Sequence, residues 1–152
     1  MAALKARGRG WPAGEEGQRL AALLDGWLAE LAELYAEPRV ASIRIRASTR
    51  MSRSLARAYL DQGLVRIAAP MLASRHLREI VVHEVAHIVC HWQHGRVRPH
   101  GAEWRRLMRA GGVAARARLA ADDVHLPPAR RRRSVRRPAR IRSLGDFVRS
   151  LL

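Results

Sequence analysis

The chain has 152 residues, of which 48% are apolar, a length and composition typical of one compact domain. No apolar run approaches the length of a membrane span, no apolar segment follows the basic N-terminus, and the single cysteine, Cys90, excludes an internal disulfide; we therefore expect a cytoplasmic protein without membrane contact. The net charge of +16, from 29 basic and 13 acidic residues, favours a polyanionic partner such as nucleic acid.

The first predicted element is a long amphipathic helix. After a basic N-terminal segment, residues 1–14, which we expect to be flexible, apolar side chains recur at helical spacing over residues 15–37. They are Leu20, Leu23, Leu24, Trp27, Leu31, Leu34 and Tyr35. Pro38 ends the pattern, because proline cannot continue a helix. Trp27 and Tyr35 are therefore predicted core residues.

Three short strands are predicted next. Residues 40–46 alternate between apolar and polar side chains, as a half-buried strand does, and residues 55–60 and 64–68 form two further strands. Residues 61–63 between them have the composition of a hairpin turn, in which Gly63 is free to adopt a positive φ. The pattern predicts a small three-stranded sheet that contains a hairpin.

The remainder of the domain is predicted to be helical. Ser74 is expected to cap a helix over residues 75–93, and the apolar residues on most sides of that helix indicate that it is buried. A shorter helix is predicted over residues 101–110 and a last one over residues 114–121. The chain is thus expected to form helices before and after one small sheet.

The buried helix carries the motif H-E-x-x-H, formed by His83, Glu84 and His87. Residues four apart lie on one helical face about 6 Å from each other, so the two imidazoles can converge on one metal ion. Glu84 lies beside them, where it can polarise a zinc-bound water and take its proton. A carboxylate in an otherwise apolar helix would be costly without a metal or a partner. The motif therefore predicts a zinc site with Glu84 as the catalytic base.

A catalytic zinc site needs a third protein ligand and one open position. His91 lies eight residues after His83, about 12 Å along the helix axis, which is too far for both to bind one ion. His100 is the favoured third ligand, because a loop returns the chain and a new helix begins there. Glu103 and His94 remain alternatives. Trp104, near His100, is predicted to be a core residue.

Residues 126–152 differ in composition from the predicted domain, which we place at residues 15–125. Eight arginines lie within residues 130–142, and such a block repels itself and cannot form a core, so we expect a disordered tail. The predicted phosphate-binding residues are Arg130, Arg131, Arg132, Arg133, Arg136 and Arg137. Binding to DNA, including single-stranded DNA, is expected to be independent of base sequence. The alternative is a tail that only keeps the protein soluble.

The two motif segments together resemble the SprT-like metallopeptidases. The H-E-x-x-H of residues 83–87 is followed by His100-Gly101-Ala102-Glu103-Trp104, and that family has an HGxxW or HGxxF segment after its HExxH. Residues 52–68 are similar to the hairpin that precedes the motif helix in the family. The resemblance covers residues 15–112. The chain departs from many relatives in lacking a C-terminal cysteine zinc ribbon, in whose place the arginine-rich residues stand.

The resemblance implies a zincin-type α+β domain in which His83, His87 and His100 hold zinc and Glu84 is the general base. Relatives of the Spartan type degrade proteins crosslinked to DNA, which implies a zinc metalloendopeptidase that acts on proteins associated with DNA. A second hypothesis is a basic nucleic-acid-binding protein with a structural metal and no hydrolase activity. A third is a metallohydrolase that acts on bonds other than peptide bonds.

Overall fold

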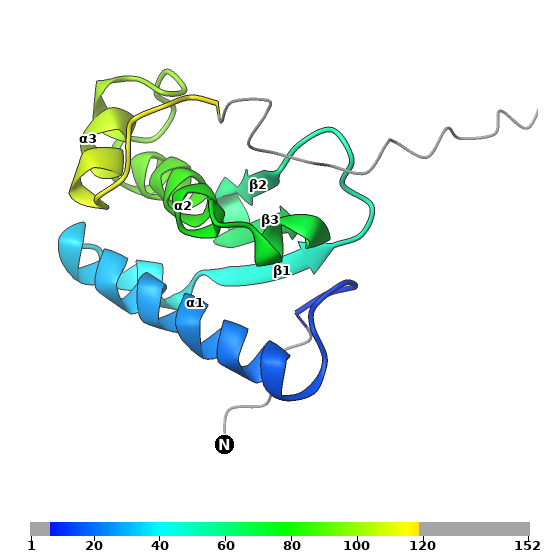
Figure 1. Cartoon of the computed structure of the whole chain (residues 1–152). Helices are drawn as coiled ribbons and strands as arrows, with labels where there is room; N and C mark the ends of the chain where they lie inside the picture. Colours follow the sequence, from blue (N-terminus) through cyan, green and yellow to red (C-terminus); the bar gives the residue numbers. More distant parts are fainter. Residues whose placement is uncertain (1–6, 119–152) are drawn as a thin grey trace, which may run out of the picture.

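The computed structural model of the protein describes residues 7–118, and the predicted α+β class is confirmed (Figure 1). Its helices and strands are α1 (Gly14–Leu34), β1 (Arg44–Ser48), β2 (Ala56–Tyr59), β3 (Leu64–Ala68), α2 (Leu77–His94) and α3 (Ala102–Ala110). Short 3-10 helices span Pro38–Ser42, Leu60–Gln62 and Ala69–Ala73. No helix within the described range is long and apolar enough to cross a membrane.

The segment that precedes α1 contacts both α1 and the first strand of the sheet. The guanidinium of Arg7 forms an ion pair with Asp25 of α1 at 2.8 Å, and the Ala47 N–H of β1 donates to the Arg7 carbonyl at 2.7 Å. We predicted that residues 1–14 would be flexible. In the structure, the contacts of Arg7 attach residues 7–13 to α1 and β1. Tyr35 is buried as predicted, whereas Trp27 is half-buried beneath the guanidinium of Arg78.

The sheet has the strand order β1-β3-β2, with β1 parallel to β3 and β2 antiparallel to it. The second and third predicted strands are present, and Gly63 between them has a φ of 53°. The first strand begins at Arg44 rather than at residue 40. Pro38 favours a helical turn at its own position, and the chain completes a 3-10 helix over Pro38–Ser42 before it extends.

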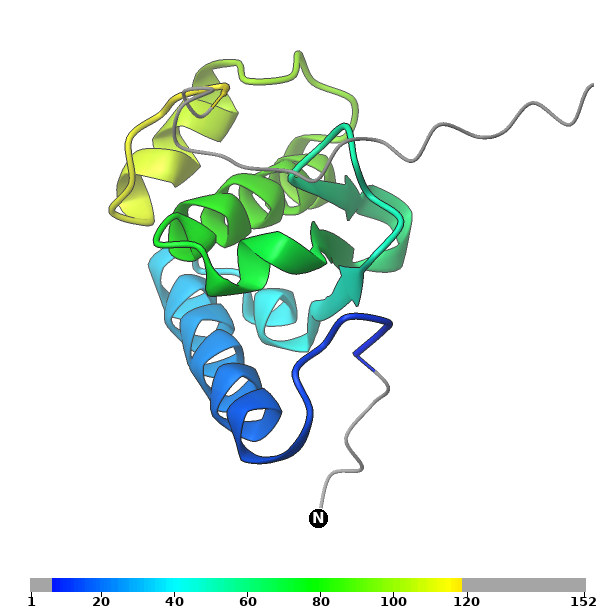
Figure 2. The same cartoon turned by 45° about the vertical axis from the view of Figure 1, so that its right-hand side comes forward.

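One face of the sheet is buried against the helices, and the helices gather on that side (Figures 1 and 2). The register pairs Ile45 with Val65 and Ala47 with Ile67, and these four side chains belong to the hydrophobic core together with residues of α1, α2 and α3. Because side chains alternate along a strand, the residues between them project from the opposite face of the sheet.

The second helix runs through the centre of the core, as its apolar sequence predicted. Val81, Val82, Val85, Ile88 and Val89 are each fully buried. The helix begins at Leu77, two residues later than expected, and ends at His94, one residue later than expected. A buried helix holds its side chains in defined rotamers, which matters for the motif residues that it carries.

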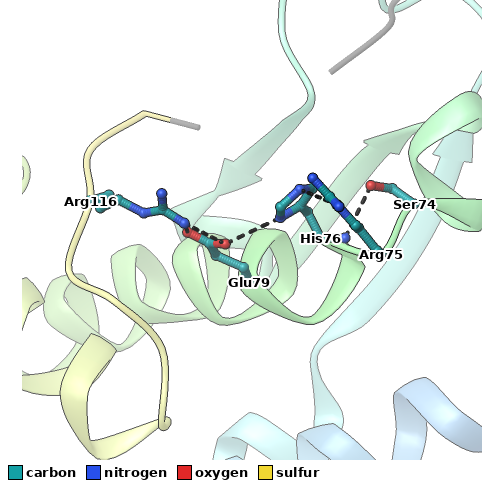
Figure 3. A network of polar contacts seen from close by, with 5 residues as sticks. All are labelled: Ser74, Arg75, His76, Glu79 and Arg116. Atoms are coloured by element: carbon teal, nitrogen blue, oxygen red, sulfur yellow. Dashed lines mark hydrogen bonds and ion pairs between the residues drawn. The ribbon is translucent and has the colours of Figure 1, made fainter. Parts of the chain in front are cut away.

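The segment after α3 crosses the beginning of α2 and is fastened there by a polar network (Figure 3). Ser74 Oγ accepts from the His76 N–H at 3.1 Å, and Glu79 receives two hydrogen bonds from the Arg116 guanidinium, at 3.1 and 3.3 Å. The predicted helix over residues 114–121 is wrong for its described part. Residues 114–118 are not helical, because this short stretch carries Arg116 across α2 to Glu79.

The glycine that follows α3 fills a tight position in the core. A Cβ at Gly111 would lie 2.7 Å from Val82 Cγ1 and 2.8 Å from the Tyr35 hydroxyl oxygen. We expect Gly111→Ala to lower the free energy of unfolding by about 1–3 kcal/mol, because overpacking strains a dense core. Gly26→Ala is the control, since nothing lies within 4 Å of its Cβ position in α1. Gly26→Ala should raise the free energy of unfolding by about 0.5–1 kcal/mol. Urea denaturation measures both variants.

Candidate metal centre

Three histidine side chains converge at the surface of α2. The Nε2 atoms of His83 and His87 are 3.3 Å apart, those of His87 and His100 are 3.1 Å apart, and those of His100 and His83 are 3.3 Å apart. Three imidazoles bound to one tetrahedral zinc at about 2.0–2.1 Å would have their nitrogens about 3.3 Å apart. Within the described range, these histidines are the one group of three or more donors that is arranged to hold a metal ion.

The local backbone explains how each imidazole reaches the centre. His83 and His87 are one turn apart on the same face of α2, whose remaining faces are buried in the core. His100 arrives from the loop before α3 and has a φ of 56°, in the left-handed region that favours glycine. The Gly101 N–H donates to the Arg98 carbonyl at 3.1 Å and closes this turn. A residue held in a strained backbone conformation indicates a functional requirement at position 100.

One side of the histidine cluster opens to solvent. His87 and His100 line a pocket of about 520 Å³, whose wall also includes Tyr59, His91 and Trp104. All three clustered histidines are half-buried, neither sealed in the core nor freely exposed. An ion held by three protein ligands next to an open pocket keeps a position for water or substrate, which distinguishes catalytic zinc sites from closed structural ones.

The electrostatic environment keeps the imidazoles neutral. Burial lowers the pKa of His83 to about 4, with a further contribution from neighbouring His100. Burial likewise lowers the pKa of His87 to about 4, assisted by the other two imidazoles. The pKa of His100 is also lowered, by burial and then by the charge of Arg105. Neutral imidazole is the form that binds a metal, so the cluster is in its ligand form at pH 7.

Glu84 follows the first of these histidines on α2. Burial raises the pKa of its carboxyl group to about 7, against the opposing effects of a hydrogen bond from the Ala58 backbone and the positive charge of Arg57. Both Arg57 and Ala58 belong to β2, so the second strand sets the environment of this carboxyl. A carboxyl group with a pKa near 7 is suited to exchange protons at neutral pH.

Two residues support the cluster in ways that the sequence did not predict. The indole of Trp104 lies 4.7–5.7 Å from the three imidazoles, measured between ring centroids, and its N–H donates to the His83 carbonyl at 3.3 Å. Trp104 is buried, as predicted, but it is also the platform beneath the cluster. Arg116 forms a backbone hydrogen bond with His83 while its guanidinium holds Glu79, one turn earlier on α2 (Figure 3). Nothing in the sequence around Arg116 pointed to this contact.

Replacing the platform should weaken the metal site without removing a ligand. We expect Trp104→Phe to lower the affinity for zinc about tenfold, because the substitution removes the hydrogen bond to the His83 backbone and part of the packing beneath the imidazoles. Competition against a chromophoric chelator measures the affinity. The matched control is Trp27→Phe on α1, which should leave it unchanged; equal losses in both variants would contradict the assigned role.

The structure does not bring the alternative ligands to the cluster. His94 is exposed at the end of α2, and Glu103 lies in the first turn of α3 outside the group. His91 lines the pocket and pairs with Asp61 at 3.0 Å. The predicted phosphate-binding residues, with the predicted tail 126–152, lie outside the described residues. They are Arg130, Arg131, Arg132, Arg133, Arg136 and Arg137.

Comparisons with known proteins find several relatives that share one name. The chain is similar to Protein SprT of Pseudomonas paraeruginosa, 36% identical over 83 residues, which are 52% of this chain and 47% of that protein. It is 41% identical over 58 residues to Protein SprT of Vibrio parahaemolyticus, covering 36% of this chain and 34% of that protein. For Protein SprT of Glaesserella parasuis the identity is 38% over 55 residues, 34% of this chain and 35% of the relative.

The matched segments thus span about a third to a half of the length of these relatives. No solved structure matches the chain. The model of the SprT-like family matches residues 24–125, a range that includes α2, the histidine cluster and α3. The predicted family resemblance is therefore confirmed, and the chain belongs to the SprT-like family.

Proposed function

We propose that the protein is a zinc-dependent metallopeptidase that hydrolyses peptide bonds, and that it acts on proteins associated with nucleic acid. The observation that carries the first part is the convergence of three imidazoles, with Nε2 atoms 3.1–3.3 Å apart, beside an open pocket. Three nitrogen ligands with an open fourth position are typical of catalytic zinc.

The residues around the centre have the chemistry that peptide hydrolysis requires. A bound zinc ion would supply a Lewis acid and lower the pKa of water in the open position to about 7. Glu84 is the group that moves the proton: its carboxylate accepts it from the attacking water and delivers it to the nitrogen of the leaving amine. A pKa near 7 allows the carboxyl group to perform both steps.

The second part of the proposal rests on charge. The protein carries a net charge of +16, and the excess favours binding to a polyanion that has substrate proteins attached to it. The alternative of a binding protein with a structural metal is less well supported. Structural zinc takes four protein ligands, whereas this cluster offers three within the described part of the chain.

The test is cleavage of a basic DNA-binding protein by the purified, zinc-loaded protein, with and without single-stranded DNA. Cleavage that increases when DNA is present would support both parts of the proposal. Cleavage that is indifferent to DNA would leave the peptidase and remove the nucleic-acid part. Stoichiometric zinc binding without any cleavage would favour the binding protein or a hydrolase for another class of bond.

A further inference from the structure

The face of the sheet opposite the helices carries a row of positive charge. The register places Arg46 of β1 beside Arg66 of β3, and Arg66 beside Arg57 of β2. Neighbouring strands are about 4.8 Å apart, and like charges at directly opposed positions destabilise a sheet. The three aligned guanidinium groups repel one another, and a ligand of opposite charge would relieve that repulsion.

Part of this row forms a pocket with two arginines from the loop between β1 and β2. We name it the arginine pocket: it has a volume of about 300 Å³, and Arg50, Arg53, Arg57 and Arg66 line it together with serine, methionine and tyrosine side chains. Among the residues that the structure describes, no acidic one lines it. None of the four guanidinium groups forms an ion pair with another described residue.

The arginine pocket adjoins the metal centre through one residue. Tyr59, at the end of β2, lines both the arginine pocket and the larger pocket that contains His87 and His100. The guanidinium of Arg66 lies over the Tyr59 ring, 5.1 Å from its centroid. A ligand in the arginine pocket therefore lies next to the candidate active site.

We propose that the arginine pocket binds the phosphodiester backbone of a nucleic acid strand and holds it beside the metal centre, an inference that rests on the nucleic-acid part of the proposed function. Guanidinium groups bind phosphate through two parallel hydrogen bonds. The hydroxyls of Ser48, Ser52 and Ser54 in the same pocket are further donors to phosphate oxygens.

The number of charges favours nucleic acid over an acidic peptide. One arginine satisfies one carboxylate, as Arg78 does with Glu30 elsewhere in this structure. Four guanidinium groups in one pocket, with Arg46 next to it in the row, instead match a ligand that carries charges at short, regular intervals. A nucleic acid strand carries one charge about every 3.4 Å of duplex axis. The pocket contacts backbone and not base edges, so binding is independent of base sequence.

The test removes two charges from the arginine pocket in the full-length protein. Arg53→Gln/Arg66→Gln is compared with a control of equal net charge, Arg106→Gln/Arg109→Gln on the exposed face of α3. Fluorescence anisotropy with a labelled oligothymidylate measures affinity at several salt concentrations. The pocket variant should lose about tenfold in affinity, and its salt slope should fall by about 1.4, which is two contacts at about 0.7 each on a single strand. The control should lose threefold at most.

The outcomes separate this inference from its alternatives. Equal losses in both double variants would show a diffuse charge effect and overturn the pocket. No loss in either would place binding elsewhere, for example in residues 126–152. An unchanged oligothymidylate affinity with a raised KM for acidic peptides, but not for neutral ones, would make the pocket a peptide subsite. The anisotropy measurement does not depend on hydrolysis. The affinity that it reports would therefore remain valid if the protein proved not to be a peptidase. Thermal melting of both variants controls for folding.

Discussion

Glu84→Gln should abolish most hydrolysis while the protein still binds one zinc ion. We expect the rate of peptide cleavage to fall by about 10²- to 10⁴-fold, because glutamine keeps the shape of the side chain but cannot accept a proton. Zinc content should not change, since His83, His87 and His100, the proposed ligands, remain in place. Cleavage rate and zinc content, measured on the same preparation, test the two statements together.

The matched control is Glu33→Gln, which makes the same chemical change at an exposed position of α1. Hydrolysis by this variant should equal that of the wild type. The melting temperatures of the metal-free proteins show whether Glu84→Gln is folded, and the direction of their difference can be predicted. Burial raises the pKa of Glu84 from 4.5 to about 7, so its charged form destabilises the folded state as pH rises through this range. Glu84→Gln should therefore melt higher than the wild type at about pH 8. Full activity of Glu84→Gln would overturn the assigned role of Glu84.

Removing the third imidazole should remove the metal. We expect His100→Ala to lower zinc affinity by more than about 100-fold. Loss of a residue that only supports a metal ligand lowers metal affinity about 10- to 100-fold, and loss of the ligand itself should lower it further. Hydrolysis should disappear with the metal. His100→Gly should show the same loss of zinc, but its metal-free form should be more stable than His100→Ala by up to about 1 kcal/mol, because glycine adopts the φ of 56° without strain.

The control for this pair is His94→Ala, at the exposed end of α2. Chelator competition should give wild-type zinc affinity for this variant, and urea denaturation compares the metal-free proteins. If His94→Ala lost zinc and His100→Ala retained it, the third ligand would be His94, and the helix would have to unwind at its end to deliver it. Equal stability of His100→Gly and His100→Ala would argue against strain at position 100.

The parts of the site that the sequence predicted are those that depend on local geometry. The spacing of His83 and His87 places both on one face of any helix, because each residue advances the helix by 1.5 Å and about 100°. The apolar residues around them indicated that the helix is buried, and α2 is buried. The φ of Gly63 likewise follows from the short turn between two strands.

Secondary structure predicted from the local sequence pattern was wrong where other interactions contributed more free energy than the local preference did. Residues 40–42 alternate like a strand but complete the 3-10 helix that Pro38 begins. Residues 114–118 are rich in alanine and were predicted to be helical, yet they cross α2, where Arg116 binds Glu79. Helix propensity contributes only a fraction of a kcal/mol per residue, which a few tertiary contacts exceed.

The sequence by itself determined the family, the α+β class and the two motif histidines with Glu84 between them. Only the tertiary structure decided which of His94, His100 and Glu103 joins the cluster, and only the strand register brought Arg46, Arg57 and Arg66 into one row. The physical reason is that the motif residues are close together in the sequence, whereas the other residues are far apart in it. Bond geometry sets the arrangement of residues within one turn, whereas residues separated by loops meet where the packing of the whole core places them.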